Sequence, residues 1–506
     1  MDRKKLAVKS SMIGLGSKLL AAMLAFISRK IFLQCLGKDL LGINGTLSQV
    51  LDTLSLTELG FQTTIIFQLY KPLAKNDYVA VSQILMLLRR LYFLIGIIIL
   101  VVGMASSPIL KYIITKVDVD FSTVYIVYFI MLLGTAASYL LSYNKALLQA
   151  DQKMYVINLI DSLLQIVSTV AKIMCMVVYK SFILYAVIGA ACTVGGNLLS
   201  FMYYKRNYGW IDKKANADKL LRSTLLRNTK DVFLGRIGGY VYASTDNLVI
   251  SSFVGTSWVG LVGNYTTIVA AVKMVLFGLT SPIQPMLGNY AVSKSREETL
   301  KTMNNYGFIR FALSVFLLIP TLCLSDMFVG LFYGDQFVLQ PVIAVLLTAD
   351  LFIICMQGAV GELIDALGYF RQERNLYIVY AVMNICLSIV GAVMWGVVPV
   401  FAATVISQTV GWVWRSIIAY RHYFRSRKMF VAYWKRQAQY SVFFIAMSVS
   451  ILGLKEAIKL PFSIIGFLGY GMIAEIVTGA AFIFLYRKKA EFVYLKSLIS
   501  RLIPKR

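Results

Sequence analysis

Residues 54–74 read LSLTELGFQTTIIFQLYKPLA, a mostly apolar run that contains a single acidic residue, Glu58. An ionised carboxylate inside hydrocarbon costs several kcal/mol unless it meets a partner or water. Either the run is no membrane span, or Glu58 faces a wet interior. The composition favours the second: the 506 residues are 58% hydrophobic and 15% charged, whereas soluble proteins have about 25% charged residues. The sequence therefore predicts an all-α, polytopic membrane protein.

Apolar runs and basic loops alternate along the chain. A membrane helix needs about 20 mostly apolar residues. Fourteen runs qualify, centred near residues 22, 56, 97, 131, 167, 192, 242, 269, 319, 354, 387, 409, 448 and 474. With a cytoplasmic N-terminus, the loops on that side carry 35 Lys and Arg residues and the opposite loops carry 6. Because Lys and Arg mark cytoplasmic loops, both termini are predicted to be cytoplasmic. The net charge of +26 thus reflects topology and does not indicate nucleic-acid binding.

Glycines recur at one spacing in the two halves of the chain. At an offset of 218 residues, four glycines and one basic residue coincide. The pairs are Gly37 with Gly255, Gly42 with Gly260, Gly45 with Gly263, Gly60 with Gly278, and Lys18 with Arg236. The first and seventh spans both begin on the cytoplasmic side, so the repeat is parallel. It predicts two six-helix lobes, and transporters built from such repeats bind substrate between them.

The predicted organisation has four parts. Residues 1–204 form an N-terminal lobe with spans one to six, and residues 230–420 a C-terminal lobe with spans seven to twelve. Between them lies a cytoplasmic amphipathic linker over residues 205–229. Residues 216–231 pair a leucine stripe with a basic face, a pattern typical of a helix at the membrane surface. Residues 421–506 hold a basic loop, two extra spans and a cytoplasmic tail.

Basic residues inside the predicted spans are candidate substrate-binding groups. Lys18, Arg236 and Lys273 lie about two turns in from the cytoplasmic ends and are expected to face a central water-filled cavity. For Lys172, nearer the outer side, the cavity and snorkelling to the headgroups are both open. Snorkelling is the favoured interpretation of Arg29, Lys30, Arg310 and Arg415. Arg29 is nevertheless kept in the cationic set, which favours an anionic substrate such as a pyrophosphate.

Nine acidic residues also fall inside the predicted spans: Asp52, Glu58, Asp161, Asp231, Asp246, Asp350, Glu362, Asp365 and Glu475. Glu58, Asp52 and Asp246 are the candidates for carrying a coupling Na⁺ or H⁺, a role that suits carboxylates inside the membrane. The favoured alternative for Glu58 is a structural pairing within its lobe, for example with Lys18. Local capping or pairing is the alternative for Asp246.

Catalytic and nucleotide-binding motifs are absent from the sequence. There is no Walker loop and no G-x-G-x-x-G at a strand-to-helix turn, which argues against ATP hydrolysis. The only histidine is His422, in a basic loop, and the six cysteines show no metal-ligand spacing. The sequence therefore predicts a protein that is no enzyme and holds neither a cofactor nor a metal.

Two segments carry a family resemblance. Residues 29–74 read RKIFLQCLGKDLLGINGTLSQVLDTLSLTELGFQTTIIFQLYKPLA, and residues 245–265 read TDNLVISSFVGTSWVGLVGNY. Both resemble Wzx-type polysaccharide flippases of the multidrug/oligosaccharidyl-lipid/polysaccharide exporter (MOP) superfamily. The resemblance implies two lobes that open alternately and move undecaprenyl-pyrophosphate-linked oligosaccharide repeat units to the outer leaflet of the bacterial cytoplasmic membrane. Polymerases and other surface-polysaccharide assembly proteins would be partners.

Three other functions stay open. Lipid II flippases also have two helices beyond the twelve of the two lobes, so this function is one alternative. A cation-coupled multidrug exporter has the same fold but usually prefers acidic residues in its cavity. An enzyme of the same pathway would need a long outer loop with catalytic polar residues, and the sequence has none. The cationic set favours a flippase of an anionic lipid over the exporter.

Overall fold

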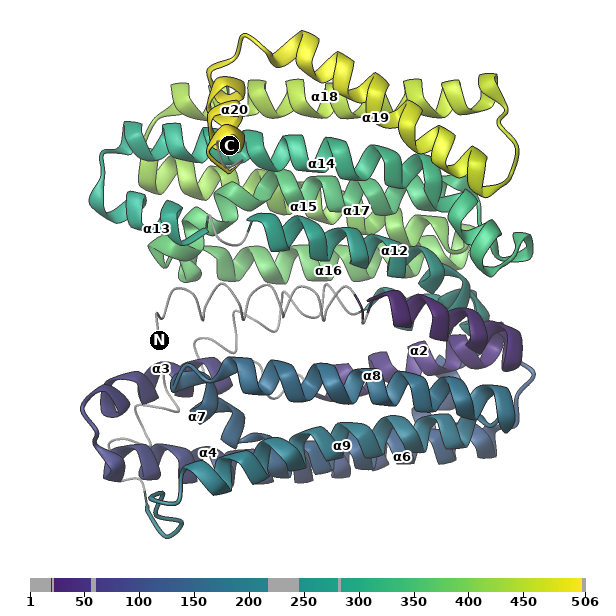
Figure 1. The fold of residues 1–506 in the computed structure, drawn as a ribbon, viewed down its shortest axis with the longest axis vertical. Helices are drawn as coiled ribbons and strands as arrows, with labels where there is room; N and C mark the ends of the chain where they lie inside the picture. Colours follow the sequence, from purple (N-terminus) through teal and green to yellow (C-terminus); the bar gives the residue numbers. More distant parts are fainter. Residues whose placement is uncertain (1–19, 21, 56–60, 217–244, 281–283, 503–506) are drawn as a thin grey trace. The chain divides into compact units, whose positions relative to one another are not determined.

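The computed structural model describes residues 20, 22–55, 61–216, 245–280 and 284–502 (Figure 1). Every regular element in these ranges is a helix. Ten of the described helices are long and apolar enough to cross a membrane. The prediction of an all-α, polytopic fold is therefore confirmed.

The ten helices coincide with predicted spans, namely those centred near residues 97, 131, 167, 192, 269, 319, 354, 387, 448 and 474. The span predicted near residue 409 is helix α17 (Val398–Ile418), which is not among the ten. The spans predicted near residues 22, 56 and 242 lie partly outside the described residues.

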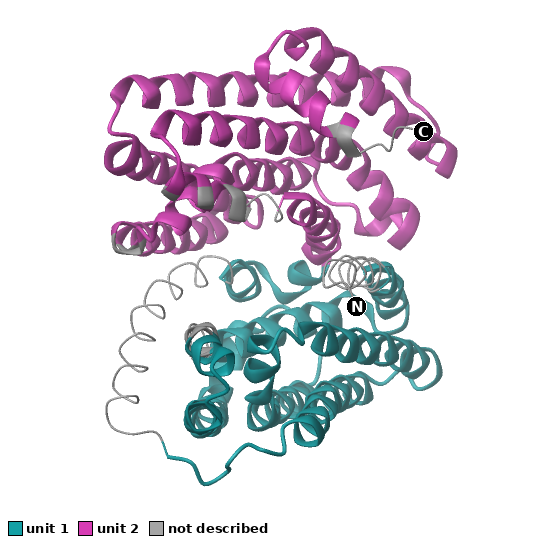
Figure 2. Ribbon diagram, turned by 60° about the vertical axis from the view of Figure 1, so that its left-hand side comes forward, with its two compact units in different colours: residues 1–260 teal, residues 261–506 magenta. Residues whose placement is uncertain are grey.

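The chain divides into two compact units, residues 1–260 and 261–506 (Figure 2). The division falls within α12 (Thr256–Thr280). Residues 217–244, which include much of the predicted surface linker and the start of the second lobe, lie outside the described part of the chain. The four-part organisation stays a prediction.

Unit 1 consists of long helices joined by short connections. Its described helices are a segment over residues 22–35, α2 (Gly37–Leu54), α3 (Phe61–Ala74), α4 (Tyr78–Ser106), α5 (Leu110–Ile113), α6 (Phe121–Ser142), α7 (Asn144–Ala150), α8 (Met154–Val178), α9 (Phe182–Asn207) and α11 (Asp246–Val249). Helix α6 packs against α4 and α9, and α9 packs against α8. The backbones of α6 and α9 approach closely, since a Cβ built on Gly134 would lie 2.8 Å from Cβ of Ala190. Small residues permit such close packing between membrane helices.

Unit 2 is built around the long helix α14 (Arg296–Tyr333). Its other elements are α13 (Gln284–Ser293), α15 (Pro341–Leu367), α16 (Phe370–Trp395), α17, the π-helix η5 (Ala419–Phe424), α18 (Arg427–Ile458), α19 (Ile464–Tyr486) and α20 (Ala490–Leu502). Helix α14 packs against α15, α18 and α19. The rings of Phe311 on α14 and Tyr440 on α18 stack with centroids 4.1 Å apart, inside the buried core. The two C-terminal membrane helices are thus part of the core of unit 2.

Candidate functional site

Polar side chains follow one face of three neighbouring helices in unit 1. They are Thr135, Ser138, Tyr139 and Ser142 on α6, Asp161, Gln165, Ser168, Thr169 and Lys172 on α8, and Cys192, Thr193 and Asn197 on α9. Within each helix the positions are mostly spaced by three or four residues, which puts them on a common face. Polar groups are costly against lipid. Turning these faces toward one another removes them from that contact.

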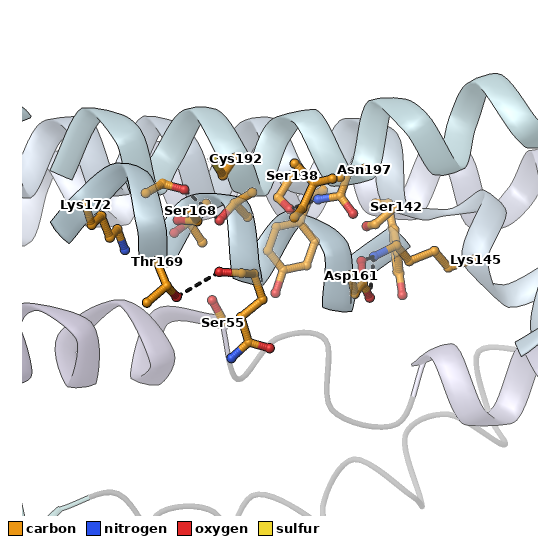
Figure 3. Close-up of a pocket in the computed structure, with 18 residues that line it drawn as sticks. Ser55, Ser138, Ser142, Lys145, Asp161, Ser168, Thr169, Lys172, Cys192 and Asn197 are labelled. Carbon is orange, nitrogen blue, oxygen red and sulfur yellow. Dashed lines mark hydrogen bonds and ion pairs between the residues drawn. The ribbon is translucent and has the colours of Figure 1, made fainter. Parts of the chain in front are cut away.

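The three faces enclose a cavity of about 680 Å³ (Figure 3). Ser55 at the end of α2, Tyr92 of α4 and Lys145 of α7 also line it. Ligand pockets usually measure about 300–1,000 Å³ and are mostly apolar. This cavity has an ordinary size but an unusual lining, because nine of its eighteen lining residues carry a hydroxyl group. It offers many hydrogen-bonding groups to one polar ligand.

The two lysines that line the cavity differ in whether a carboxylate pairs with them. Lys145 and Asp161 form a local ion pair with Nζ 3.1 Å from Oδ1. Lys172 forms no ion pair within the described part of the chain, and its Nζ lies 4.6 Å from the ring centroid of Tyr185. A Cβ built on Gly189 would lie only 2.9 Å from that Nζ. Among the described residues of the cavity, Lys172 is thus a cation that no carboxylate pairs with.

Contacts between the lining residues fix the shape of the cavity. Asn197 of α9 donates a hydrogen bond to the hydroxyl of Ser138 on α6. The rings of Tyr92 and Tyr139 meet edge to face with centroids 5.9 Å apart, which joins α4 to α6. The polar groups are therefore mounted on packed helices, and a ligand would find them largely in place.

Among the predicted cationic residues, Lys172 lines this cavity. Lys273 is an exposed residue of α12 with Nζ 5.9 Å from the ring centroid of Phe277. Arg29 donates from Nη2 to the backbone carbonyl of Gly260 at 2.7 Å, a contact that ties residues 22–35 to the first turn of α12. Lys18 and Arg236 lie outside the described residues. Their predicted place in a central cavity stays a prediction.

Of the predicted coupling acids, Asp52 and Asp246 do not line this cavity. Asp52 is an exposed residue of α2, and Asp246 is the first residue of α11 with partial exposure. Glu58 lies outside the described residues, so its pairing with Lys18 stays a prediction. Asp161, which the sequence placed among the acids within spans, is the one carboxylate among the described lining residues.

Snorkelling is wrong for Arg310. Its side chain is 2% exposed, and Nη1 lies 2.9 Å from Oε1 of Glu362 and 2.9 Å from the hydroxyl of Tyr306. Its Nε donates to the carbonyl of Cys355 at 2.7 Å. The guanidinium of Arg310 therefore needs no lipid headgroup as a partner, because residues of α14 and α15 supply its hydrogen bonds and its ion pair.

Snorkelling is also wrong for Arg415. Its Nε lies 2.8 Å from Oε1 of Glu373 on α16, and Nη2 donates to the hydroxyl of Tyr377 at 2.8 Å. Its Nη1 donates to Oε1 of Gln357 at 3.1 Å. Breaking one partner of a buried pair is costly because the other charge is left uncompensated. The two pairs join α14 to α15 and α16 to α17, and we interpret them as structural.

The hydroxyl and amide residues of the cavity were not predicted from the sequence. A signal for them exists: Ser138, Ser142, Thr193 and Asn197 stand in apolar helices at spacings of four residues. Serine and threonine are common in membrane helices, where they also bond to the backbone of their own helix, as Thr193 does with the carbonyl of Gly189 at 3.0 Å. Only the convergence of three such faces distinguishes a cavity from that ordinary use.

Residues 7–291, more than half of the chain, match the profile of the family described as Polysaccharide biosynthesis protein. The chain belongs to this family. Over 207 residues it is 21% identical to the probable low-salt glycan biosynthesis flippase Agl15 of Haloferax volcanii, an alignment that covers 40% of this chain and 42% of that protein. An uncharacterised membrane protein of Methanocaldococcus jannaschii is 24% identical over 426 residues, which cover 79% of this chain and 94% of the relative.

Solved structures of other membrane transporters share the fold. The lipid II flippase MurJ in an inward closed conformation has a TM-score of 0.65 at 13% identity, covering 93% of this chain and 99% of that chain. An inward-facing MATE family transporter of the MOP superfamily has a TM-score of 0.64 at 12% identity, covering 84% and 99%. The family match agrees with the predicted resemblance to proteins of polysaccharide biosynthesis, and the solved structures confirm the MATE-like fold.

Proposed function

We propose that this protein is a flippase that moves polyprenyl-pyrophosphate-linked oligosaccharide units from the inner to the outer leaflet of a bacterial cytoplasmic membrane. The hydroxyl-rich, cationic cavity of unit 1 carries the proposal. Sugar hydroxyls pair with serine, threonine, asparagine and glutamine side chains, and a lysine ammonium attracts a phosphate as a point charge. A cavity within membrane-spanning helices lets the polar headgroup cross while the prenyl chain stays in lipid.

The family assignment and the names of its relatives support the same function. One relative is named a probable glycan biosynthesis flippase and one structural neighbour is a lipid II flippase. We propose further that transport proceeds by alternating access, is driven by a Na⁺ or H⁺ gradient, involves no covalent chemistry, and delivers its product to polymerases and other polysaccharide assembly proteins. Both termini are proposed to be cytoplasmic.

A lipid II flippase is the second candidate. The two helices beyond the predicted repeat, α18 and α19, favour it, because the match to MurJ covers 93% of this chain and the match to the MATE transporter 84%. Lipid II is also a polyprenyl pyrophosphate, so Lys172 suits both substrates. A multidrug exporter of cationic compounds is disfavoured, since the uncompensated charge in the cavity is positive.

The test is translocation by the purified full chain in proteoliposomes. Polyprenyl-pyrophosphate-linked oligosaccharide is placed in one leaflet, and its exposure on the other is followed with a membrane-impermeant sugar oxidant, with and without Na⁺ and H⁺ gradients. Ser168→Leu and Thr193→Leu, which fill the cavity, should slow exposure, whereas Ser122→Leu at the exposed start of α6 should not. Exposure of lipid II alone would replace the proposal with the second candidate, and translocation of neither lipid would refute both.

A further inference from the structure

A second hollow lies in unit 2, between the end of α17, the π-helix η5 and the start of α18. Its volume is about 400 Å³. Three arginines, Arg421, Arg425 and Arg427, line it together with Ser426, Ile417 and Phe430. None of its lining residues is among those of the cavity of unit 1.

The hollow is cationic without internal compensation. All three arginines are exposed, and none of them forms an ion pair with any described residue. The sequence has no aspartate or glutamate between Glu373 and Glu456, so no acid close to them in the sequence offsets their charge. Like charges held together repel. An anion in the hollow would relieve that repulsion, and guanidinium groups bind phosphate through paired hydrogen bonds.

The backbone holds the arginines around the hollow. Arg425 has φ 53° and ψ 38°, the left-handed conformation that ends η5. The next residue, Ser426, caps α18 by accepting a hydrogen bond from the amide of Met429 at 3.3 Å. The chain therefore reverses within two residues, and Arg421 and Arg427 stand on the two arms of the reversal. The start of α18 adds the partial positive charge of its helix dipole.

An exposed apolar surface continues from the arginines along both helices. Val413 and Ile417 precede Arg421 at spacings of four residues, and both are exposed. On α18, exposed Val431 follows Arg427 by four residues. Each arm of the reversal thus presents arginine near the loop and exposed aliphatic side chains further along its helix. A free anion would use the arginines alone, whereas a phospholipid would use both surfaces.

We propose that this hollow binds the phosphate of an anionic phospholipid, whose acyl chains lie along Val413, Ile417 and Val431. The positive-inside rule places the loop at the cytoplasmic face, where anionic lipids and basic segments near the membrane attract each other. The bound lipid would anchor α18 and α19 to the rest of unit 2 at its basic loop.

The test measures lipid retention by the purified full chain in native mass spectrometry, with phosphatidylglycerol or phosphatidylcholine added. R421A/R425A/R427A should weaken phosphatidylglycerol binding about tenfold or more, the loss of one to two charge-assisted hydrogen bonds. R487A/K488A/K489A removes three exposed basic residues that follow α19 and should leave binding unchanged. R421K/R425K/R427K should bind phosphatidylglycerol with an affinity between those of the native protein and the triple alanine variant. Lysine keeps the charge but lacks the bidentate geometry of arginine.

Unfolding temperatures without lipid establish that each variant is folded, and Arg421→Ala alone gives a smaller loss of the same kind if the triple variant is unstable. Equal losses in the two triple alanine variants would overturn the proposal by showing non-specific attraction. Equal retention of phosphatidylcholine would also overturn it, and so would displacement of the lipid by millimolar inorganic phosphate, which would assign the hollow to a free anion.

Discussion

Gly42 of α2 and Gly260 of α12 pack directly against each other within unit 1, although 218 residues separate them in the sequence. A Cβ built on Gly260 would lie 3.0 Å from the backbone nitrogen of Gly42. The same separation joins Asp39 and Ser257, whose side chains are hydrogen-bonded. Beside a twofold axis, a residue meets its own equivalent. Both contacts therefore support the parallel repeat predicted from the glycine spacing.

Alanine at either glycine should destabilise the protein. A Cβ on Gly42 would lie 2.1 Å from the carbonyl oxygen of Thr256, and backbone atoms cannot move aside as a flexible side chain would. We expect Gly42→Ala and Gly260→Ala to lower the free energy of unfolding by about 1–3 kcal/mol, the usual cost of overpacking. Gly307→Ala on α14 is the control, since its Cβ would meet nothing within 4 Å. Thermal unfolding in detergent measures all three, and a Gly42→Ala variant as stable as the control would contradict the tight crossing.

Gly358 gives a matched experiment in unit 2. A Cβ at this position would lie 2.0 Å from Nη2 of Arg310, whose guanidinium is held by Glu362, Tyr306 and the carbonyl of Cys355. Gly358→Ala should therefore displace the guanidinium and lower the unfolding temperature. Gly411→Ala on α17, where a Cβ has free space, should leave that temperature unchanged or raise it. Similar shifts in both variants would mean that Arg310 relocates without loss.

The ion pair between Arg310 and Glu362 should show strong coupling in a double-mutant cycle. Arg310→Met leaves the carboxylate of Glu362 without its cation, and breaking a buried pair in this way costs about 3–5 kcal/mol. Glu362→Gln in the same chain should recover a substantial part of that loss, because neither charge then remains. Denaturant unfolding of the two single variants and the double variant gives the coupling energy, and additive effects would show that the pair is not energetically linked.

The sequence predicted the spans and failed on the partners of charged residues, for a physical reason. An apolar run such as α4 or α15 is a local property, and so is the alternation of basic loops. The pairing of Arg310 with Glu362 is not, since 52 residues separate them and their contact depends on how α14 and α15 pack. Taken alone, an arginine in a span is equally compatible with snorkelling and with a buried pair. The charge of Lys172 distinguishes it in an apolar helix, whereas the hydroxyl-bearing residues around it are uncharged and of types that are common in membrane helices.

Transport by variants of Lys18 and Arg236 provides a functional test of the predicted repeat. They coincide at the 218-residue offset and were predicted to contribute cations to one cavity. Lys18→Ala and Arg236→Ala should each reduce translocation of the lipid-linked oligosaccharide while the amount of folded protein in the membrane stays normal. Lys111→Ala, an exposed residue of α5, serves as the control. Full activity of both variants at normal expression would refute the cationic role of this pair.

Lys172 and Gly189 allow the cavity of unit 1 to be tested by charge and by position separately. Lys172→Ala removes the uncompensated cation, and a charge-assisted hydrogen bond to a phosphate is worth about 1.5–3 kcal/mol, or about a 10- to 100-fold weaker apparent affinity for the pyrophosphate-linked substrate. Gly189→Ala keeps the charge but places a Cβ 2.9 Å from the present position of Nζ, so it should shift the ammonium and produce a smaller loss of the same sign.

Concentration series of the lipid-linked oligosaccharide in proteoliposomes separate these effects. Lys172→Arg should retain most of the affinity, because the charge remains and the ring of Tyr185, 4.6 Å from Nζ in the native protein, also accommodates a guanidinium. Equal affinity of all variants for the pyrophosphate-linked substrate would exclude Lys172 from binding it. A loss in Lys172→Ala that persists with a monophosphate-linked analogue, and vanishes with an uncharged one, would identify the phosphate as the group that the lysine attracts.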